Sequence, residues 1–479
     1  MNALALHTRG TDAIPLAPRP SLEQYSRQAE DLAGACRSGD SGAVRAWAAD
    51  WIERLARLQS QSLTPEYVSM DAPGHLDRAH IRREVDGIVD AAHQYGLIAP
   101  GSAREPSLAD AQLFLAWLHG FESWPAFAAH IQSLQQADSP VSQFESAADT
   151  IVTGDVATLE KLIRRNPQLV RARSTRDHHA TLLHYVAANG HEGFRQRTPP
   201  NAIAIAEVLL EAGAEVDALA DMYGYRCTTM EMLVSSVHPP AAGVQIQLVE
   251  TLLVFGAAVN GVEDNGSPLM TALRFHYPDA AETLARRGAR IDNIISAAAL
   301  GRVDLVDSFV ADDGTLRPHA LLADVPWPRL PADPAVHLGH ALTWACVFGR
   351  SGVVELLLRK GVDASGRDGD ATALHFAAAY GRMDLVRLLL HHGASLETLN
   401  SYDGTVLSGT LWFAFNCPVQ GVDYAAVVRE LIDAGARADV YPEMKADVDA
   451  VLAAAWLRHP HIVPAGDPAT QAPHTEPGA

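Results

Sequence analysis

Apolar residues recur along the chain with the spacing of helices, and each apolar helix is followed by a glycine. In residues 385–394 (LVRLLLHHGA), leucine and valine cover most of the surface of a helix. Such a surface is buried only against a neighbouring pair of helices, so one unit would not fold alone. Gly393 stands just past the helix, where a left-handed residue closes the last turn. The pattern predicts an array of stacked helical repeats.

The same pattern returns at intervals along the chain. Six leucine-rich helices end at a glycine, at positions 213, 256, 288, 361, 393 and 435. These glycines are 43, 32, 73, 32 and 42 residues apart, and the longest interval contains a degenerate unit at 297–314. The first helices also agree, as in TLLHYVAANGH at 181–191 and TALHFAAAYGR at 372–382. We therefore predict eight units, which begin near residues 144, 177, 220, 263, 293, 333, 366 and 400.

The repeated unit resembles the ankyrin repeat. The family pattern is a T-x-L-H-x-A-A first helix, a glycine turn, a V-x-x-L-L second helix and a G-A-x-x-N/D exit, and residues 372–384 match it most closely. The resemblance implies an all-α fold, an ankyrin-repeat solenoid of helix-turn-helix units with short turn fingers, over residues 141–440. It also implies that His184 and His375 bridge the turns of adjacent repeats. A helix within 441–460 is expected to cap the array.

A small helical domain is predicted before the repeats, over residues 21–140. Apolar residues have helical spacing in 29–58, 80–97 and 107–134, and Ser107 is a predicted N-cap. The last segment is similar to one that precedes ankyrin repeats in many bacterial proteins of unknown function, and this resemblance implies no activity. Four aromatic residues on one helical face are expected to dock the domain on the first repeat, with an exposed partner site as the alternative: Trp117, Phe121, Trp124 and Phe127.

Composition indicates a folded protein with disordered ends. Apolar residues make up 48% of the 479 residues, whereas residues 1–20 and 461–479 are rich in proline, threonine, alanine and glycine. No run approaches about 18 consecutive apolar residues, and the first 20 residues lack a basic start followed by an apolar run, so neither a membrane span nor a secretion signal is expected. The four widely separated cysteines predict neither a disulfide framework nor a zinc ribbon.

Charge indicates the kind of partner. The chain has 37 basic against 57 acidic residues, a net charge of −20, which argues against nucleic-acid binding because phosphate contacts need a basic face. Three lysines against 34 arginines, together with the many alanines, are typical of a GC-rich bacterial genome. We expect a bacterial, cytoplasmic protein whose partner is another protein of basic character.

Motifs for catalysis or cofactor binding are missing from the sequence. It contains no G-x-x-x-x-G-K, G-x-S-x-G or H-E-x-x-H motif, no dinucleotide-binding glycine pattern and no EF-hand loop. His337 and His340 lie three residues apart near Asp333, but a third ligand at the usual spacing is missing. Neither a metal nor a cofactor is therefore expected.

Four inserted segments interrupt the repeats, at 193–201, 238–244, 317–339 and 416–422. Insertions in a solenoid lie on loops and often carry function. One hypothesis is that these loops roof a pocket, which would make the chain an enzyme or a small-molecule binder. Trp344 and Trp412 are better explained as core residues, but both belong to the candidate pocket set, which is His276, Tyr277, His337, His340, Trp344 and Trp412.

A protein-binding scaffold is the favoured function. The predicted turn fingers at 221–226, 367–370 and 401–404 bring aromatic and charged residues together, and tyrosine and arginine often dominate interface energies. A bacterial effector or an immunity partner of a toxin is a further alternative that fits the same residues. The predicted partner contacts, which would act with the concave groove, are Tyr223, Tyr225, Arg226, Arg367, Asp368 and Tyr402.

Overall fold

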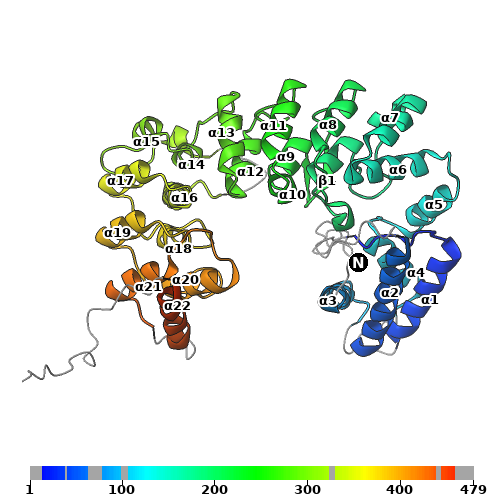
Figure 1. The fold of residues 1–479 in the computed structure, drawn as a ribbon, viewed down its shortest axis with the longest axis horizontal. Helices are drawn as coiled ribbons and strands as arrows, with labels where there is room; N and C mark the ends of the chain where they lie inside the picture. The colour runs from blue at the N-terminus through cyan, green and yellow to red at the C-terminus, as the bar shows by residue number, and fades with distance from the viewer. Residues whose placement is uncertain are drawn as a thin grey trace, which may run out of the picture. The chain divides into compact units, whose positions relative to one another are not determined.

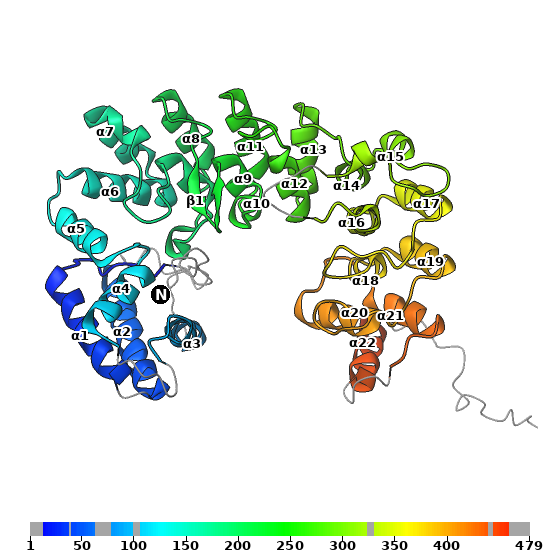
Figure 2. The ribbon, with the colours of Figure 1, turned by 180° about the vertical axis from the view of Figure 1, so that it is seen from behind.

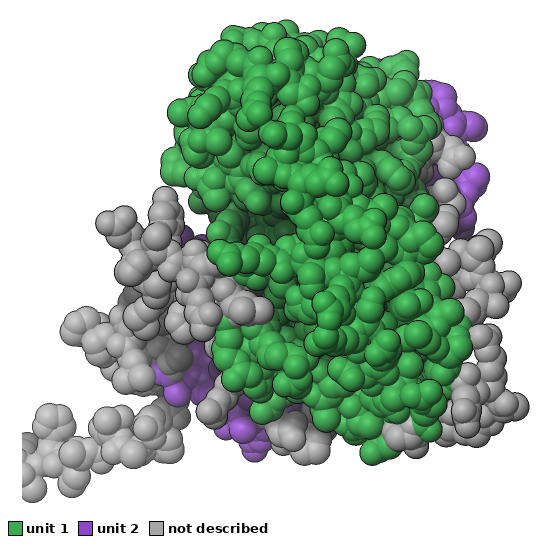
Figure 3. Space-filling model, turned by 90° about the vertical axis from the view of Figure 1, so that its right-hand side faces the viewer, with its two compact units in different colours: residues 1–289 green, residues 290–479 purple. Residues whose placement is uncertain are grey.

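The structure is a computed structural model, which describes residues 13–37, 40–62, 78–98, 106–322, 330–438 and 444–458. The described residues are mostly helical, with one two-stranded sheet among them, as Figure 1 and the reverse view in Figure 2 show. The chain divides into two compact units, Met1–Ala289 and Arg290–Ala479, which are coloured separately in Figure 3.

Unit 1 begins with five helices that share one aromatic core. Trp51, Phe114 and Phe127 are among its buried residues. The Ser107 hydroxyl accepts a hydrogen bond from the Asp110 N–H, and the Asp110 carboxylate accepts one from the Ser107 N–H, so α4 begins at the predicted cap. The five helices are α1 (Leu22–Arg37), α2 (Ser41–Ser62), α3 (Arg78–Gln94), α4 (Leu108–Leu118) and α5 (Trp124–Leu134).

The segment before α1 is packed against the protein, so the expectation of a disordered arm over residues 1–20 is wrong for its described part. Ile14 is buried, its N–H donates to the Leu118 carbonyl (2.8 Å), and its carbonyl accepts from His119 Nδ1 (2.8 Å). Composition suggested disorder because prolines surround only a few apolar residues, but those few fill a space at the end of α4. Residues 1–12 lie outside the described residues.

Four pairs of helical segments follow within the described part of unit 1. In Figures 1 and 2, α7, α8, α11 and α13 stand in one row, and α6, α9 and α12 stand in a second row. The first members of the pairs are α6 (Pro140–Thr153), η4 (Leu182–Ala187), α9 (Thr229–Leu233) and α12 (Ser267–Arg274). The second members are α7 (Val156–Arg165), α8 (Ala202–Glu211), α11 (Gln245–Val254) and α13 (Pro278–Arg286). Between them lie η3 (Pro167–Arg171), η5 (Gly193–Arg195), β1 (Ala220–Met222), β2 (Tyr225–Cys227) and α10 (His238–Ala241).

The described residues of unit 2 form four further helix pairs and a final helix. The first members are α14 (Ile294–Ala299), α16 (Pro334–Val347), α18 (Ala373–Ala379) and α20 (Val406–Asn416), and η6 (Pro318–Ala320) precedes α16. The second members are α15 (Val303–Phe309), α17 (Ser351–Arg359), α19 (Met383–His391) and α21 (Tyr424–Asp433). The last helix, α22 (Met444–Arg458), packs on α20 and α21 within the segment predicted as the cap. The expected disordered tail, 461–479, lies outside the described residues.

Buried histidines join adjacent repeats, as the resemblance implied. His375 Nδ1 accepts from the Thr372 N–H (3.3 Å), so Nε2 carries the proton and donates to the Gly404 carbonyl (3.1 Å) of the next turn. His184 donates in the same way to the Cys227 carbonyl (3.3 Å). Burial lowers the pKa of His184 to about 4, which keeps its imidazole neutral. The predicted bridging role of both histidines is confirmed.

Candidate functional site

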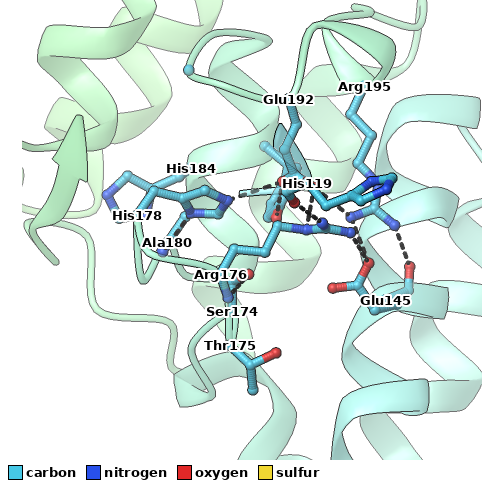
Figure 4. Close-up of polar contacts among 12 residues, drawn as sticks. His119, Glu145, Ser174, Thr175, Arg176, His178, Ala180, His184, Glu192 and Arg195 are labelled. Carbon is cyan, nitrogen blue, oxygen red and sulfur yellow. Dashed lines mark hydrogen bonds and ion pairs between the residues drawn. The ribbon is translucent and has the colours of Figure 1, made fainter. Parts of the chain in front are cut away.

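Four buried ionisable side chains meet in unit 1 and form what we call the charged cluster (Figure 4). Glu145 lies on α6, Arg176 follows η3, Glu192 precedes η5, and Arg195 ends η5. Arg176 lies between η3 and η4, and Arg195 belongs to the inserted segment at 193–201, which precedes α8. Because the four residues are widely spaced, they form no motif in the sequence.

Each carboxylate of the charged cluster contacts both guanidinium groups. Arg176 Nε lies 2.7 Å from Glu192 Oε1, and Arg176 Nη2 lies 3.2 Å from Glu145 Oε2. Arg195 Nη1 lies 2.9 Å from Glu145 Oε2 and 3.2 Å from Glu192 Oε1. Figure 4 shows these ion pairs converging around the Arg176 side chain. The two positive and two negative charges therefore neutralise one another locally.

The electrostatics of the charged cluster keep all four groups ionised. Burial works to raise the pKa of Glu145 and Glu192, but the guanidinium groups of Arg176 and Arg195 hold both below the usual range. The Tyr185 hydroxyl donates to Glu192 Oε2 (2.5 Å), and burial raises the pKa of that hydroxyl well above its usual value. No carboxyl of the charged cluster is therefore set to exchange a proton near neutral pH.

The charged cluster also connects the first helices of the chain to the repeats. Arg176 Nη1 donates to the His119 carbonyl (2.8 Å) at the end of α4, and its guanidinium lies 5.4 Å from the centre of the Phe121 ring. Arg195 Nη2 lies 2.7 Å from Asp149 Oδ1 on α6. An adjoining cavity of about 10 Å³ has room for about one water molecule. The arrangement is that of a structural junction.

The predicted finger at 221–226 is the hairpin formed by β1 and β2. Tyr223 and Gly224 form its turn with φ of 54° and 79°, as a two-residue hairpin of this hand requires. The Tyr223 hydroxyl donates to Asn189 Oδ1 (2.5 Å), and 46% of the residue is exposed. Tyr225 is half-buried, whereas Arg226 is exposed. Tyr223 and Arg226 are accessible to a partner, and Tyr225 is less so.

The other predicted finger residues have two different roles. Some of them hold a turn in shape, and one of them is exposed at the tip of a turn. Arg367 donates to the Gly369 carbonyl (2.8 Å), and Asp368 Oδ1 accepts from the Asp370 N–H (3.1 Å). Both side chains hold the turn in shape. Tyr402, at the tip of the next finger, is 89% exposed.

Aromatic side chains form a surface on α18, on the residue that follows it and on α20 of unit 2, which we call the aromatic row: Phe376, Tyr380, Phe413, Trp412 and Phe415. The ring centres are 6.5 Å apart between Phe376 and Tyr380, 6.3 Å between Tyr380 and Phe413, and 5.4 Å between Phe413 and Trp412. Trp412 is 53% exposed, and Phe415 on the next helical turn is 51% exposed. Trp412 and Phe415 are thus two exposed aromatic side chains on neighbouring turns of α20, beside the half-buried rings of Phe376, Tyr380 and Phe413.

The expectation that Trp412 belongs to the core is wrong, whereas Trp344 is buried as expected. Trp412 is the seventh residue after Thr405, which caps α20, and Ala379 is the seventh after Thr372, which caps α18. Ala379 fills this register position as a small buried side chain. An indole is too large for the same space between helices, so the ring of Trp412 lies outside.

The inserted segment at 416–422 forms one wall of a recess beside the aromatic row. Tyr424 fixes this segment, because its hydroxyl accepts from the Val419 N–H (3.1 Å) and donates to the Ala379 carbonyl (2.9 Å). Tyr380 belongs both to the aromatic row and to the recess. The recess encloses about 470 Å³ between Tyr380, Gly381, Arg382, Met383, Val419, Gln420, Gly421, Val422, Asp423, Ala426 and Val427.

The residues of the hypothetical catalytic pocket line neither of the two cavities described above. His276 and Tyr277 lie between α12 and α13 in unit 1. His337 and His340 are buried in α16 of unit 2, where His340 Nδ1 donates to the Val336 carbonyl (3.0 Å). Among the described residues, no three His, Cys, Asp or Glu side chains are grouped as a metal site would require. No helix in that part of the chain is long and apolar enough to cross a membrane.

Comparison with known families identifies the repeats of unit 2. A family model described as ankyrin repeats, in three copies, matches residues 294–400, which extend from the start of α14 to the finger before α20. These residues are ankyrin repeats. With the helix pairs and bridging histidines, the match confirms the predicted all-α ankyrin-repeat fold.

Two further comparisons add little beyond this assignment. The crystal structure of the human ASB11 ankyrin repeat domain matches with 19% identity over 53% of this chain and 98% of that chain, with a TM-score of 0.26. No curated protein sequence matches the chain.

Sequence reasoning missed the charged cluster and much of the aromatic row. The one available signal for the charged cluster was the insertion at 193–201, which contains Arg195. For the aromatic row, the signal was Trp412, because the same register position in the repeat at 372–382 is occupied by Ala379.

Proposed function

We propose that this chain is a protein-binding scaffold that contacts its partner through the aromatic row and the finger turns of unit 2. Ankyrin repeats generally mediate contacts between proteins, and stacked repeats present extended binding surfaces. The observation that carries the proposal is that Trp412 and Phe415, one helical turn apart, are both more than half exposed. Contiguous apolar surface of this kind marks interaction sites.

The expected energetic contribution of these side chains is large. Burying one aromatic side chain against a partner contributes about 1.5–3 kcal/mol. Tyr402, exposed at the tip of the preceding finger, adds a hydroxyl that can bind a polar group of the partner. The fingers of unit 1 contribute to the same function through Tyr223 and Arg226, which are also exposed.

The proposal is tested by quantitative affinity capture from lysate of the source cells. The full chain is compared with a Trp412→Ala, Phe415→Ala double variant and with a Val254→Ala, Val303→Ala control, which truncates exposed apolar residues elsewhere. The proposal predicts a protein that the wild type and the control recover and the aromatic variant loses. Equal recovery by all three chains, with circular dichroism showing equal folding, would contradict it.

A further inference from the structure

The finger end of the aromatic row is acidic. Asp370 and Asp403 are exposed on adjacent turns, which are joined by the Ser401 N–H donating to the Asp370 carbonyl (2.7 Å). Asp368 adds a third carboxylate. One arginine, Arg367, lies on the same two turns, where it donates to the Gly369 carbonyl, so three carboxylates stand against one guanidinium group. A partner therefore meets a negative potential at the start of α18 and α20, and an apolar, aromatic surface further along them.

The distance between the acidic turns and the aromatic row sets the length of a partner segment that would contact both. Trp412 is seven residues beyond the cap of α20 at Thr405, which corresponds to about 10 Å along the helix axis. An extended peptide covers this distance in about three residues. A segment with basic and large apolar side chains about three residues apart would thus place each kind of side chain on its counterpart.

The aromatic faces favour the same partner. Arginine guanidinium groups stack on exposed aromatic rings, and the attraction increases when water is removed. Long-range electrostatic attraction also favours a basic partner, because the whole chain has a net charge of −20. An acidic partner would meet repulsion at Asp370 and Asp403 before it reached the aromatic row.

We propose that the aromatic row and the carboxylates of Asp368, Asp370 and Asp403 form a docking surface for an extended basic segment of a partner protein, with arginine or lysine about three residues from a large apolar residue. This proposal rests on the proposed function and specifies the chemistry of the partner. The surface lies within unit 2, so it requires no particular placement of unit 1.

The test uses the full chain and a library of displayed random peptides of about 12 residues, long enough to cross both helices. The most enriched peptide is labelled with fluorescein, and its affinity is measured by polarisation. The expected peptide has a positive net charge and the basic and apolar spacing given above. Its dissociation constant rises at least about tenfold for Trp412→Ala, Phe415→Ala and for Asp370→Asn, Asp403→Asn.

Matched controls separate binding from folding. Trp412→Phe keeps an aromatic face and is expected to bind within about threefold of the wild type. Asp433→Asn removes an exposed carboxylate at the end of α21 and is expected to leave the affinity unchanged. Salt is expected to weaken binding of the enriched peptide, because exposed charge pairs are screened.

Three other kinds of result would overturn the proposal, and the experiment distinguishes them from one another. Enriched peptides that are neutral or acidic, yet depend on Trp412, would reject the basic partner and leave the proposed function intact. Peptides that bind equally to all variants, or the absence of any enriched peptide, would reject the docking surface. A dimer that forms with increasing concentration and is lost in Trp412→Ala, Phe415→Ala would identify a second copy of this chain as the occupant instead.

Discussion

Single glycines show how closely neighbouring repeats meet. Gly381 has a φ of +64°, and a Cβ atom there would lie 2.6 Å from Val422 Cγ1 of the inserted segment. Gly393 has a φ of +81°, but a Cβ atom there would meet nothing within 4 Å. Gly381→Ala is expected to lower the free energy of unfolding by about 2–4 kcal/mol, and Gly393→Ala by about 1–2 kcal/mol. Urea unfolding measures both, and equal losses would contradict the close contact.

The charged cluster gives a second prediction at the residue scale. Arg195→Met leaves Glu145 and Glu192 with one guanidinium group between them in a buried site. We expect a loss of about 3–5 kcal/mol in the free energy of unfolding, because an uncompensated charge stays buried. Arg387→Met is the control, since it removes an exposed pair with Glu430 worth at most about 1 kcal/mol. Similar losses for both variants in urea unfolding would show that the charged cluster is not a junction.

At the scale of elements, the sequence predicts the helices whose ends are set by local capping residues. It does not predict the segments whose conformation is set by contacts with a neighbouring repeat. The cap at Ser107 begins α4 as predicted, and Thr372, the first residue of the repeat motif, caps α18. The first helix of the second repeat is instead the short 3₁₀ segment η4, and Ala188 after it has a φ of 48°. The Asn189 side chain donates to the Met232 carbonyl (2.9 Å) of the next repeat, which fixes this irregular loop. No local pattern encodes such a contact.

The inserted segment at 416–422 gives a prediction at this scale. The Tyr424 hydroxyl connects Val419 to the Ala379 carbonyl of the preceding repeat. Tyr424→Phe removes both hydrogen bonds and is expected to cost about 1–3 kcal/mol and to speed amide exchange at the segment. Tyr402→Phe is the control, because that side chain is exposed. Hydrogen exchange followed by mass spectrometry that finds no difference at the segment would contradict the role of Tyr424.

At the scale of the whole molecule, periodicity predicts the repeat fold but not the division into units. The domain boundary near residue 140 stays a prediction, and α1 to α5 lie in the same compact unit as the repeats up to Ala289. The contacts of Arg176 with the His119 carbonyl and the Phe121 ring explain this connection. Such contacts join residues more than 50 positions apart, so apolar spacing along the sequence does not reveal them.

Stability is expected to depend on pH through buried histidines. Burial lowers the pKa of His130 and His184 to about 4, against about 6.5 in the unfolded chain. Between these values the unfolded state binds more protons, so the free energy of unfolding is largest above pH 6.5 and falls as the pH decreases towards 4. Each histidine contributes up to about 3 kcal/mol. Urea unfolding of the full chain across this range measures the effect, and constant stability would contradict the buried neutral imidazoles.

The most direct test of protein binding by the aromatic row is site-specific photocrosslinking in the source cells. A benzophenone amino acid replaces Trp412 in the full chain, and in a parallel chain it replaces Val254, which is 69% exposed on α11. Irradiation is followed by mass spectrometry of the adducts. We expect position 412 to crosslink to one or a few defined proteins and position 254 to give no such adduct. No adduct at position 412, or the same adducts at both positions, would contradict it.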